Sequence, residues 1–219
     1  MNPDLATRPI DWQITDVWIM YALLIPTVVL FGWGIWRHVR LWRLGQPDLR
    51  WDRPGERLKR LGVYALGQAR ILQRRAFGFA HAALFWTMIL LFGGTLVALV
   101  HHDLGIAIMQ GWFYLIYQSL ILDIAGILAV LALVGFFVRR WVVAPTGARL
   151  ADRPAGWALP DWVLPLLLLI SCLQGFVLEE LRIVGTNDPW AGWSPGGWLL
   201  TGALRGLPLA TVVVTFQVL

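Results

Sequence analysis

His81 is the first residue in this sequence that suggests chemistry, because it lies in an apolar run within RRAFGFAHAALFWTMILLFGGTLVALVHHD, residues 74–103. A histidine inside hydrocarbon is costly and is therefore a functional candidate by default. Neutral imidazole is a common axial ligand of haem iron, and small neighbours such as Gly78, Ala82 and Ala83 would let a planar macrocycle approach. The alternative is a structural hydrogen bond from His81 to a neighbouring helix.

His101 and His102 end the same run and are followed by Asp103. They lie 20 and 21 residues beyond His81, or about 30 Å along a straight helix, so one cofactor cannot bind both ends. We keep them as candidates for cofactor binding or for proton transfer. His38, just past the first apolar run, is a further candidate partner or a solvated residue.

Three acidic residues interrupt or close apolar runs. Asp123 lies near the middle of the third run, where a carboxyl group should pair with a cation, hold a proton or bond to another helix. Glu179, Glu180 and Arg182 close the fourth run, and Glu179 and Arg182 are spaced to pair on one helix face. The functional alternative for Asp123, Glu179 and Glu180 is proton transfer at a quinol site.

The elements that carry these residues are predicted to be transmembrane helices. The chain is 58% hydrophobic and 14% charged, which is typical of a membrane protein. Apolar runs of about 20 residues can cross a bilayer, and backbone groups in lipid must pair within a helix. We predict an all-α, polytopic bundle forming a single domain over 1–219, with four full helices and a truncated fifth at about 17–36, 77–100, 113–138, 162–183 and 207–219.

The basic residues predict the topology. Of 18 Lys and Arg residues, 11 lie between Arg37 and Arg75 and four between Arg139 and Arg153. The positive-inside rule makes the loops 37–76 and 139–161 cytoplasmic and places the N-terminus outside. Such loops can face anionic lipid or dock a cytoplasmic subunit, and their confinement to two loops argues against a nucleic-acid partner.

The segments between the runs also carry predictions. An amphipathic helix is expected from about Pro54, an irregular loop at 142–160, and a segment at 184–206 that folds back with its tryptophans at headgroup level. The fifth run of 13 residues covers only about 20 Å, so we expect the natural protein to continue beyond Leu219 or to have had a longer ending. Cys172 is the single cysteine, so an iron–sulfur cluster would need a partner.

Residues 74–103 resemble the second helix of membrane cytochrome b subunits of the heterodisulfide-reductase-like group, relatives of the gamma subunit of respiratory nitrate reductase. The matching residues are Gly78, His81, Phe85, Trp86, Gly94 and Thr95. Further matches are GWFYLIYQSLILDIAGILAV, QGFVLEELRI and NDPWAGWSPGGW. The resemblance covers roughly residues 15–205.

This resemblance implies five helices, an N-terminus outside, and b-type haem held by histidines of helices two and five. It also implies electron transfer between a membrane quinol and a cytoplasmic iron–sulfur subunit or domain, in a bacterial or archaeal inner membrane. His81 matches the helix-two ligand. A second helix-two histidine is replaced by leucine at Leu90 and Leu91, and LPLATVVVTFQVL contains no histidine. One haem b is therefore expected and a second is in question.

The sequence thus leads to one hypothesis and one alternative. The hypothesis is a haem b-containing membrane subunit of a quinone-linked oxidoreductase, in which His81 is the axial ligand. The alternative is a membrane anchor or assembly scaffold that binds no haem.

Overall fold

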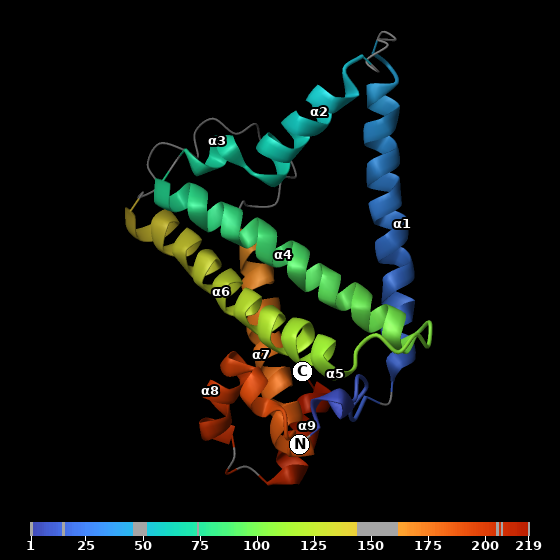
Figure 1. The fold of residues 1–219 in the computed structure, drawn as a ribbon, viewed down its shortest axis with the longest axis vertical. Coiled ribbons are helices and arrows are strands. Elements are labelled where there is room, and N and C mark those ends of the chain that lie inside the picture. The colour runs from blue at the N-terminus through green and yellow to red at the C-terminus, as the bar shows by residue number, and fades with distance from the viewer. Residues whose placement is uncertain are drawn as a thin grey trace. The chain divides into compact units, whose positions relative to one another are not determined.

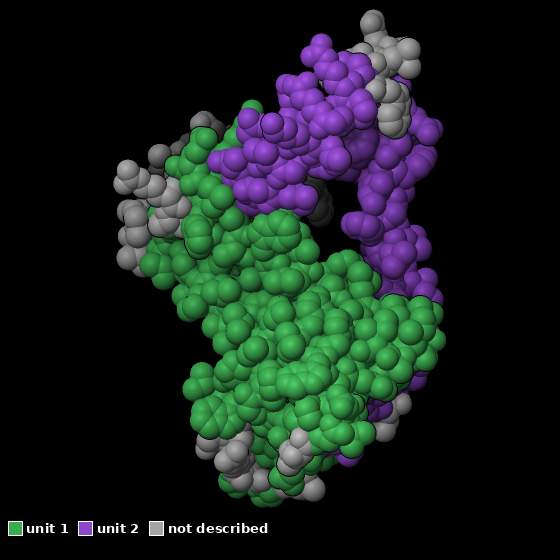
Figure 2. Space-filling view, in the orientation of Figure 1, with its two compact units in different colours: residues 1–10, 70–219 green, residues 11–69 purple. Residues whose placement is uncertain are grey.

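The computed structural model describes residues 2–14, 16–45, 52–73, 75–143, 162–204, 206 and 208–218 (Figure 1). All regular elements within these ranges are helices. The chain divides into two compact units, one made of residues 1–10 and 70–219 and the other of residues 11–69 (Figure 2).

The 11–69 unit contains the first apolar helix, α1 (Val17–Trp42). Its side chains are mostly exposed, as a lipid-facing helix requires. Near its end the guanidinium groups of Arg37 and Arg40 stack over Trp33 and Trp36, 5.2 Å and 5.7 Å from the ring centroids. Such a pairing of aromatic rings with cations suits a membrane interface.

The helix expected from Pro54 is present in the same unit. It begins as α2 (Pro54–Arg60) and continues as the π-helical segment η2 (Leu61–Leu66). Proline at the first helical position is favourable there because its missing N–H needs no partner. Whether this helix lies in the membrane interface stays a prediction.

Four helices are long and apolar enough to cross a membrane, at Val17–Trp42, Phe77–His102, Gly111–Trp141 and Val163–Thr186. They confirm the prediction of an all-helical, multi-pass membrane protein and extend somewhat beyond the predicted bounds. The second span is α4 (Arg75–His102) and the fourth is α7 (Val163–Thr186). The third span is continuous through four segments: α5 (Gly111–Phe113), η3 (Tyr114–Ile121), α6 (Leu122–Val138) and η4 (Arg139–Val143).

Two segments that the sequence predicts as a loop and as a partial helix are helical in part. The loop predicted as irregular begins at residue 142, and its first two residues are still helical because η4 extends to Val143. At the start of η4 the Arg139 guanidinium lies 4.1 Å from the Phe77 ring centroid. Residues 144–161 lie outside the described residues. The partial fifth run contains a ten-residue helix, α9 (Leu209–Val218). Its place in a membrane and the sidedness of the N-terminus stay predictions.

Close packing within the larger unit depends on glycines. α6 packs against both α4 and α7, and Figure 1 shows α4 and α6 side by side. A Cβ at Gly93 would come within 2.6 Å of the Tyr117 hydroxyl, and one at Gly94 would collide with Leu122. A Cβ at Gly78 would collide with the backbone carbonyl of Ile71, at the end of α3 (Ala69–Leu72). Gly78 therefore accommodates the chain itself, which differs from the expectation that it leaves room for a macrocycle beside His81.

The N-terminal segment closes one end of this unit. The short helix η1 (Pro3–Leu5) leads to Ala6, whose carbonyl accepts a 2.8 Å hydrogen bond from the Gly111 amide. Gly111 has φ +59°, a conformation suited to glycine. A small core joins this segment to two loops: Ala6, Ile10, Met109, Tyr114, Leu115, Trp190 and Trp193. Two of the tryptophans expected at headgroup level thus pack in this core.

The segment 184–206 folds back as predicted. After η5 (Ala191–Trp193) the chain forms α8 (Pro195–Leu204), which packs against α6 and α7. The N-terminal segment, the 103–110 loop and this segment therefore gather at one end of the unit, which we call the polar end.

Candidate functional site

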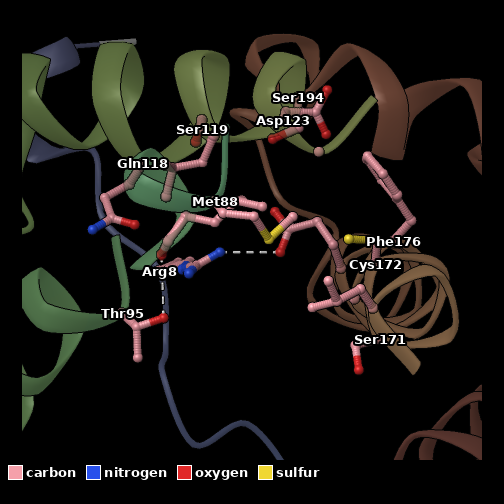
Figure 3. A pocket seen from close by; sticks show the side chains of 16 residues that line it. Arg8, Met88, Thr95, Gln118, Ser119, Asp123, Ser171, Cys172, Phe176 and Ser194 are labelled. Carbon is pink, nitrogen blue, oxygen red and sulfur yellow. Dashed lines mark hydrogen bonds and ion pairs between the residues drawn. The ribbon is translucent and has the colours of Figure 1, made fainter. Parts of the chain in front are cut away.

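A cavity of about 460 Å³ lies between α4, the η3–α6 segment and α7 (Figure 3). Its walls are mainly apolar, and its polar groups come from helices and from the N-terminal segment. The apolar lining is Met88, Leu91, Leu122, Gly126, Leu168, Cys172, Gly175 and Phe176; the polar lining is Arg8, Thr95, Gln118, Ser119, Asp123, Ser171, Glu179 and Ser194. A concave apolar site with a few placed polar groups is the usual form of a small-molecule site.

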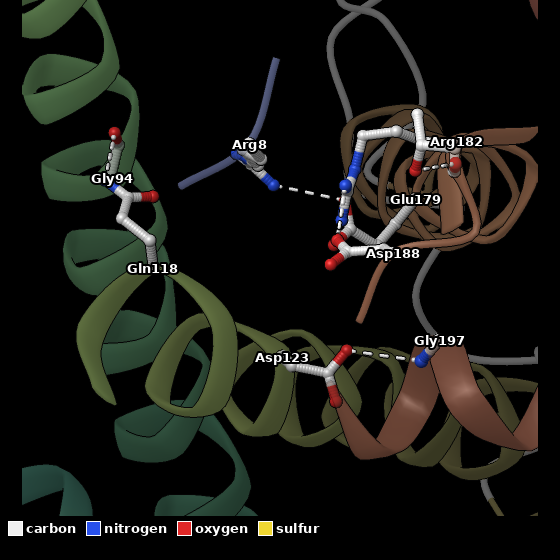
Figure 4. Close-up of polar contacts among 9 residues, drawn as sticks. Arg8, Gly94, Gln118, Asp123, Glu179, Arg182, Asp188 and Gly197 are labelled. Carbon is white, nitrogen blue, oxygen red and sulfur yellow. Dashed lines mark hydrogen bonds and ion pairs between the residues drawn. The ribbon is translucent and has the colours of Figure 1, made fainter. Parts of the chain in front are cut away.

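An ion-pair network borders this cavity (Figure 4). Arg8 Nη1 donates to Glu179 Oε2 at 3.1 Å. Arg182 donates to both Glu179 oxygens at 2.8 and 3.3 Å and, through Nη1, to Asp188 Oδ2 at 2.7 Å. The predicted pairing of Glu179 with Arg182 is confirmed. Because the Arg182 and Asp188 side chains are only 6% and 5% exposed, the network is part of the folded interior.

Glu180 differs from its neighbour. It is fully buried and does not line the cavity, whereas Glu179 does. Adjacent residues on a helix point in different directions, about 100° apart. Of the two glutamates predicted at a quinol site, the structure therefore brings only Glu179 to the cavity.

Asp123 is buried and bonded to another helix. Its Oδ2 accepts a 2.5 Å hydrogen bond from the Gly196 amide and its Oδ1 a 3.4 Å bond from the Gly197 amide. These amides lie in the first turn of α8, where free N–H groups and the helix dipole favour an anion. Asp123 thus holds α8 against α6 while lining the cavity.

Gln118 contributes a second buried polar group. It lies in the π-helical segment η3, and its Nε2 donates to the Gly94 carbonyl at 3.1 Å. Its Oε1 is buried and receives no hydrogen bond from any described residue. Figure 4 shows the nitrogen facing Gly94 and the oxygen turned toward the side where Arg8 lies.

Sequence reasoning missed both Gln118 and Arg8. Gln118 could have been noticed, because an amide within an apolar span is as unusual as the carboxyl of Asp123. Arg8 precedes the first span and gives no local signal. Only folding of the N-terminal segment onto the polar end brings it to Glu179.

His81 lies in a second, more apolar cavity, a groove of about 430 Å³ between α4 and α7. The groove is lined by His81, Leu84, Phe85, Met88, Ile89, Phe92 and Leu168. Met88 and Leu168 line both cavities. His81 and Met88 are seven residues apart, or about 10 Å along the helix. The two cavities are therefore neighbours that share two side chains.

The groove has one imidazole and an otherwise apolar lining, the chemistry that one face of a haem would need. The His81 imidazole is of the ligand type that haem iron accepts. The other side chains that line the groove are apolar, as a porphyrin face requires. Among the described residues, no group of three or more His, Cys, Asp or Glu side chains is placed to bind a metal ion. The groove thus offers a single imidazole.

The other histidines lie elsewhere. His101 Nδ1 accepts a 3.2 Å hydrogen bond from the Met109 amide, so it fastens the 103–110 loop to α4. His102 Nδ1 lies 3.6 Å from Asp103 Oδ1. Neither residue lines either of the two cavities. His38 is exposed on α1, in the other compact unit, and all three roles stay predictions.

Comparison with known proteins gives one relative and no family assignment. No family model and no solved structure matches the chain. The chain is 26% identical over 226 residues to the EtfAB:quinone oxidoreductase of Syntrophomonas wolfei subsp. wolfei (strain DSM 2245B / Goettingen). The alignment covers 99% of this chain but spans only 31% of the length of that protein. The resemblance to cytochrome b subunits stays a prediction.

Proposed function

We propose that this chain is the membrane electron-transfer subunit of a quinone-linked oxidoreductase in a bacterial or archaeal cytoplasmic membrane. The observation that carries the proposal is the pair of adjoining cavities, one with a polar end and one with a histidine, which share Met88 and Leu168. The name of the relative, a quinone oxidoreductase, supports the same link.

The larger cavity is the proposed quinol site. Its apolar walls suit a lipid-soluble ring and tail, and its polar groups suit the ring oxygens. Arg8 is held at its edge by Glu179, which is fixed in turn by Arg182. An arginine placed in this way can donate to a ring oxygen. Asp123 and Glu179 are the two carboxylates that line the cavity, and we propose them as acceptors of the quinol protons.

His81 is the residue we propose to hold a b-type haem in the apolar groove. When bound, such a haem supplies a one-electron relay whose potential depends on its axial ligand and burial. The residues of the groove exclude water and hold the imidazole beside the shared wall. A second axial ligand would have to come from outside the groove.

The electron acceptor we propose is a cytoplasmic iron–sulfur subunit or domain. Cys172 is the single cysteine, so this chain cannot build a four-cysteine cluster by itself. The basic segments 37–76 and 139–161 are the proposed docking surface, because they carry most of the Lys and Arg residues. Charge complementarity of that kind would favour an acidic partner surface.

A second candidate is an anchor or scaffold that binds no haem. The observation that favours it is the single imidazole in the groove. A helical bundle that binds haem often supplies two axial histidines. Among the described residues that line the groove, only His81 is a histidine.

The test is haem content in the detergent-purified chain, measured by a reduced-minus-oxidised spectrum and by pyridine haemochrome. We expect a b-type spectrum that His81→Ala abolishes. His102→Ala is the matched control, because it removes a histidine from the opposite end of α4, and it should retain the spectrum. If the wild-type chain, alone and in its complex, shows no haem, the anchor replaces the cytochrome.

A further inference from the structure

Gln118 lines the larger cavity, and its buried amide holds an acceptor that lacks a hydrogen bond from the described residues. Its Nε2 donates one hydrogen to the Gly94 carbonyl, and its Oε1 receives no hydrogen bond from the described residues. Gln118 is only 4% exposed, so bulk solvent does not compensate the oxygen. A buried acceptor of this kind destabilises the site until a donor arrives.

The orientation of this amide is fixed by the fold. If the amide were flipped, its oxygen would face the Gly94 carbonyl, and two acceptors would repel each other. The glycines of α4 also bring η3 and α6 so close that Leu122 contacts Gly94 and Tyr117 donates to the Leu90 carbonyl at 3.1 Å. The π-helical turn that carries Gln118 is wider than an α-turn, and such segments are frequent at functional sites.

An acceptor that lacks a donor distinguishes two forms of one ligand. A quinol carries hydroxyl groups that donate, whereas a quinone carries carbonyl groups that only accept. Arg8, on the other side of the cavity, can donate to an oxygen of either form and so does not discriminate. The carboxylates of Asp123 and Glu179 already receive hydrogen bonds from protein groups, whereas the Gln118 oxygen receives none from the described residues. A quinol hydroxyl would satisfy that oxygen and a quinone carbonyl would oppose it.

We propose that Gln118 makes this cavity selective for the reduced, hydroxyl-bearing form of its ligand, an inference that rests on the proposed quinol site. A site that hydrogen-bonds a hydroxyl rejects an analogue without one, because its own buried group then stays unpaired. We expect quinol to bind at least about tenfold more tightly than quinone of the same structure. Tighter binding of the reduced form raises the midpoint potential of the bound couple, by about 30 mV for each factor of ten in a two-electron couple.

The experiment is to measure dissociation constants for decylubiquinol and decylubiquinone on the detergent-purified full chain under anaerobic conditions, from the quenching of tryptophan fluorescence. A naphthoquinol and its naphthoquinone form a parallel pair with a different ring. We expect wild-type protein to prefer the quinol in whichever pair binds. Gln118→Leu, which is close in size and lacks the acceptor, should lower the ratio toward one by weakening quinol binding.

Two further variants separate this role from a structural one. In its protonated form the carboxyl group of Gln118→Glu offers the same donor and acceptor, so this variant should retain the preference at acidic pH. Thr87→Val removes a buried hydroxyl from α4 at a residue that lines neither cavity, and it should leave the ratio unchanged. If Gln118→Leu does not fold, the wild-type ratio and Gln118→Glu still decide.

The outcomes distinguish the two proposals. If both forms bind wild-type protein equally, or if Gln118→Leu keeps the full preference, the selectivity assigned to Gln118 is wrong and the quinol site stands. If neither form binds in either pair, the quinol site itself is wrong and the inference falls with it.

Discussion

The two cavities of the larger unit lie side by side and are built in opposite ways. At the polar end, Arg8, Asp123, Glu179, Arg182 and Asp188 are held by hydrogen bonds from several chain segments. In the groove, His81 stands among side chains that are apolar throughout. Only Met88 and Leu168 belong to both.

The difference teaches how a small membrane bundle can separate two tasks. Protons and ligand oxygens need dipoles and charges that are already oriented, and the polar end supplies these at the cost of burying ions. Electron transfer through a cofactor needs a side chain that binds the cofactor and apolar side chains around it. The groove supplies both. Substitutions at the polar end should therefore disturb folding far more than substitutions in the groove.

The largest effect is expected from Arg182→Leu. This change leaves the Glu179 and Asp188 carboxylates buried with one partner fewer each, and breaking a buried pair typically costs about 3–5 kcal/mol. The thermal unfolding midpoint in detergent should fall sharply. The control is Arg57→Leu in the exposed pair with Asp52, which should cost about 0–1 kcal/mol. Equal effects for the two arginines would show that the polar end is no more tightly built than the surface.

An intermediate effect is expected from Gly196→Ala. A Cβ there would lie 2.7 Å from the Phe176 ring and about 3 Å from both Asp123 oxygens, so the ring and the start of α8 must shift. Overpacking of this kind costs about 1–3 kcal/mol. Because Phe176 and Asp123 line the larger cavity, decylubiquinol binding should weaken as well.

Gly192→Ala is the matched control for that change. A Cβ at Gly192 meets nothing within 4 Å among the described residues, so stability and binding should stay close to wild type. Both are measured by thermal unfolding and by the fluorescence titration. A Gly196→Ala protein that matches the control would mean that α8 can move away from Asp123 freely.

The smallest effect is expected from Phe92→Ala in the groove. Phe92 is 64% exposed, and in a bilayer its ring would meet lipid chains that are about as apolar as itself. Truncation should change the free energy of unfolding by about 0.5 kcal/mol or less, whereas a buried phenylalanine would lose about 3–5 kcal/mol. A large loss of stability in detergent would show that the Phe92 ring packs against protein.

Much of the fold could be predicted from the sequence because the bilayer imposes strong constraints on it. The number and approximate bounds of the four spanning helices follow from apolar runs, since lipid forces the backbone into helices. The helix at Pro54 and the pairing of Glu179 with Arg182 follow from local spacing. His81 can also be identified as a candidate functional residue from its own segment, because a histidine within an apolar run is unusual.

The candidate site could be predicted only in part. The sequence predicts roles for Asp123 and Glu179, but the fold adds partners that are distant in sequence. These are the Gly196 and Gly197 amides for Asp123 and Arg8 for Glu179. No periodicity links residues 73 or 171 positions apart. Glu180 was grouped with Glu179, and only the direction of its side chain separates the two.

The sequence by itself determined the apolar spans, their basic flanks and the histidine within one of them, because hydrophobic length and charge act on each segment separately. The tertiary structure decided which polar groups meet. Glycines at positions 93 and 94 set how closely η3 and α6 approach α4, and that approach turns the Gln118 amide onto Gly94. Contacts of this kind depend on three-dimensional packing. Neither the cavity nor the acceptor role of the Gln118 oxygen could therefore be predicted from any one segment of the sequence.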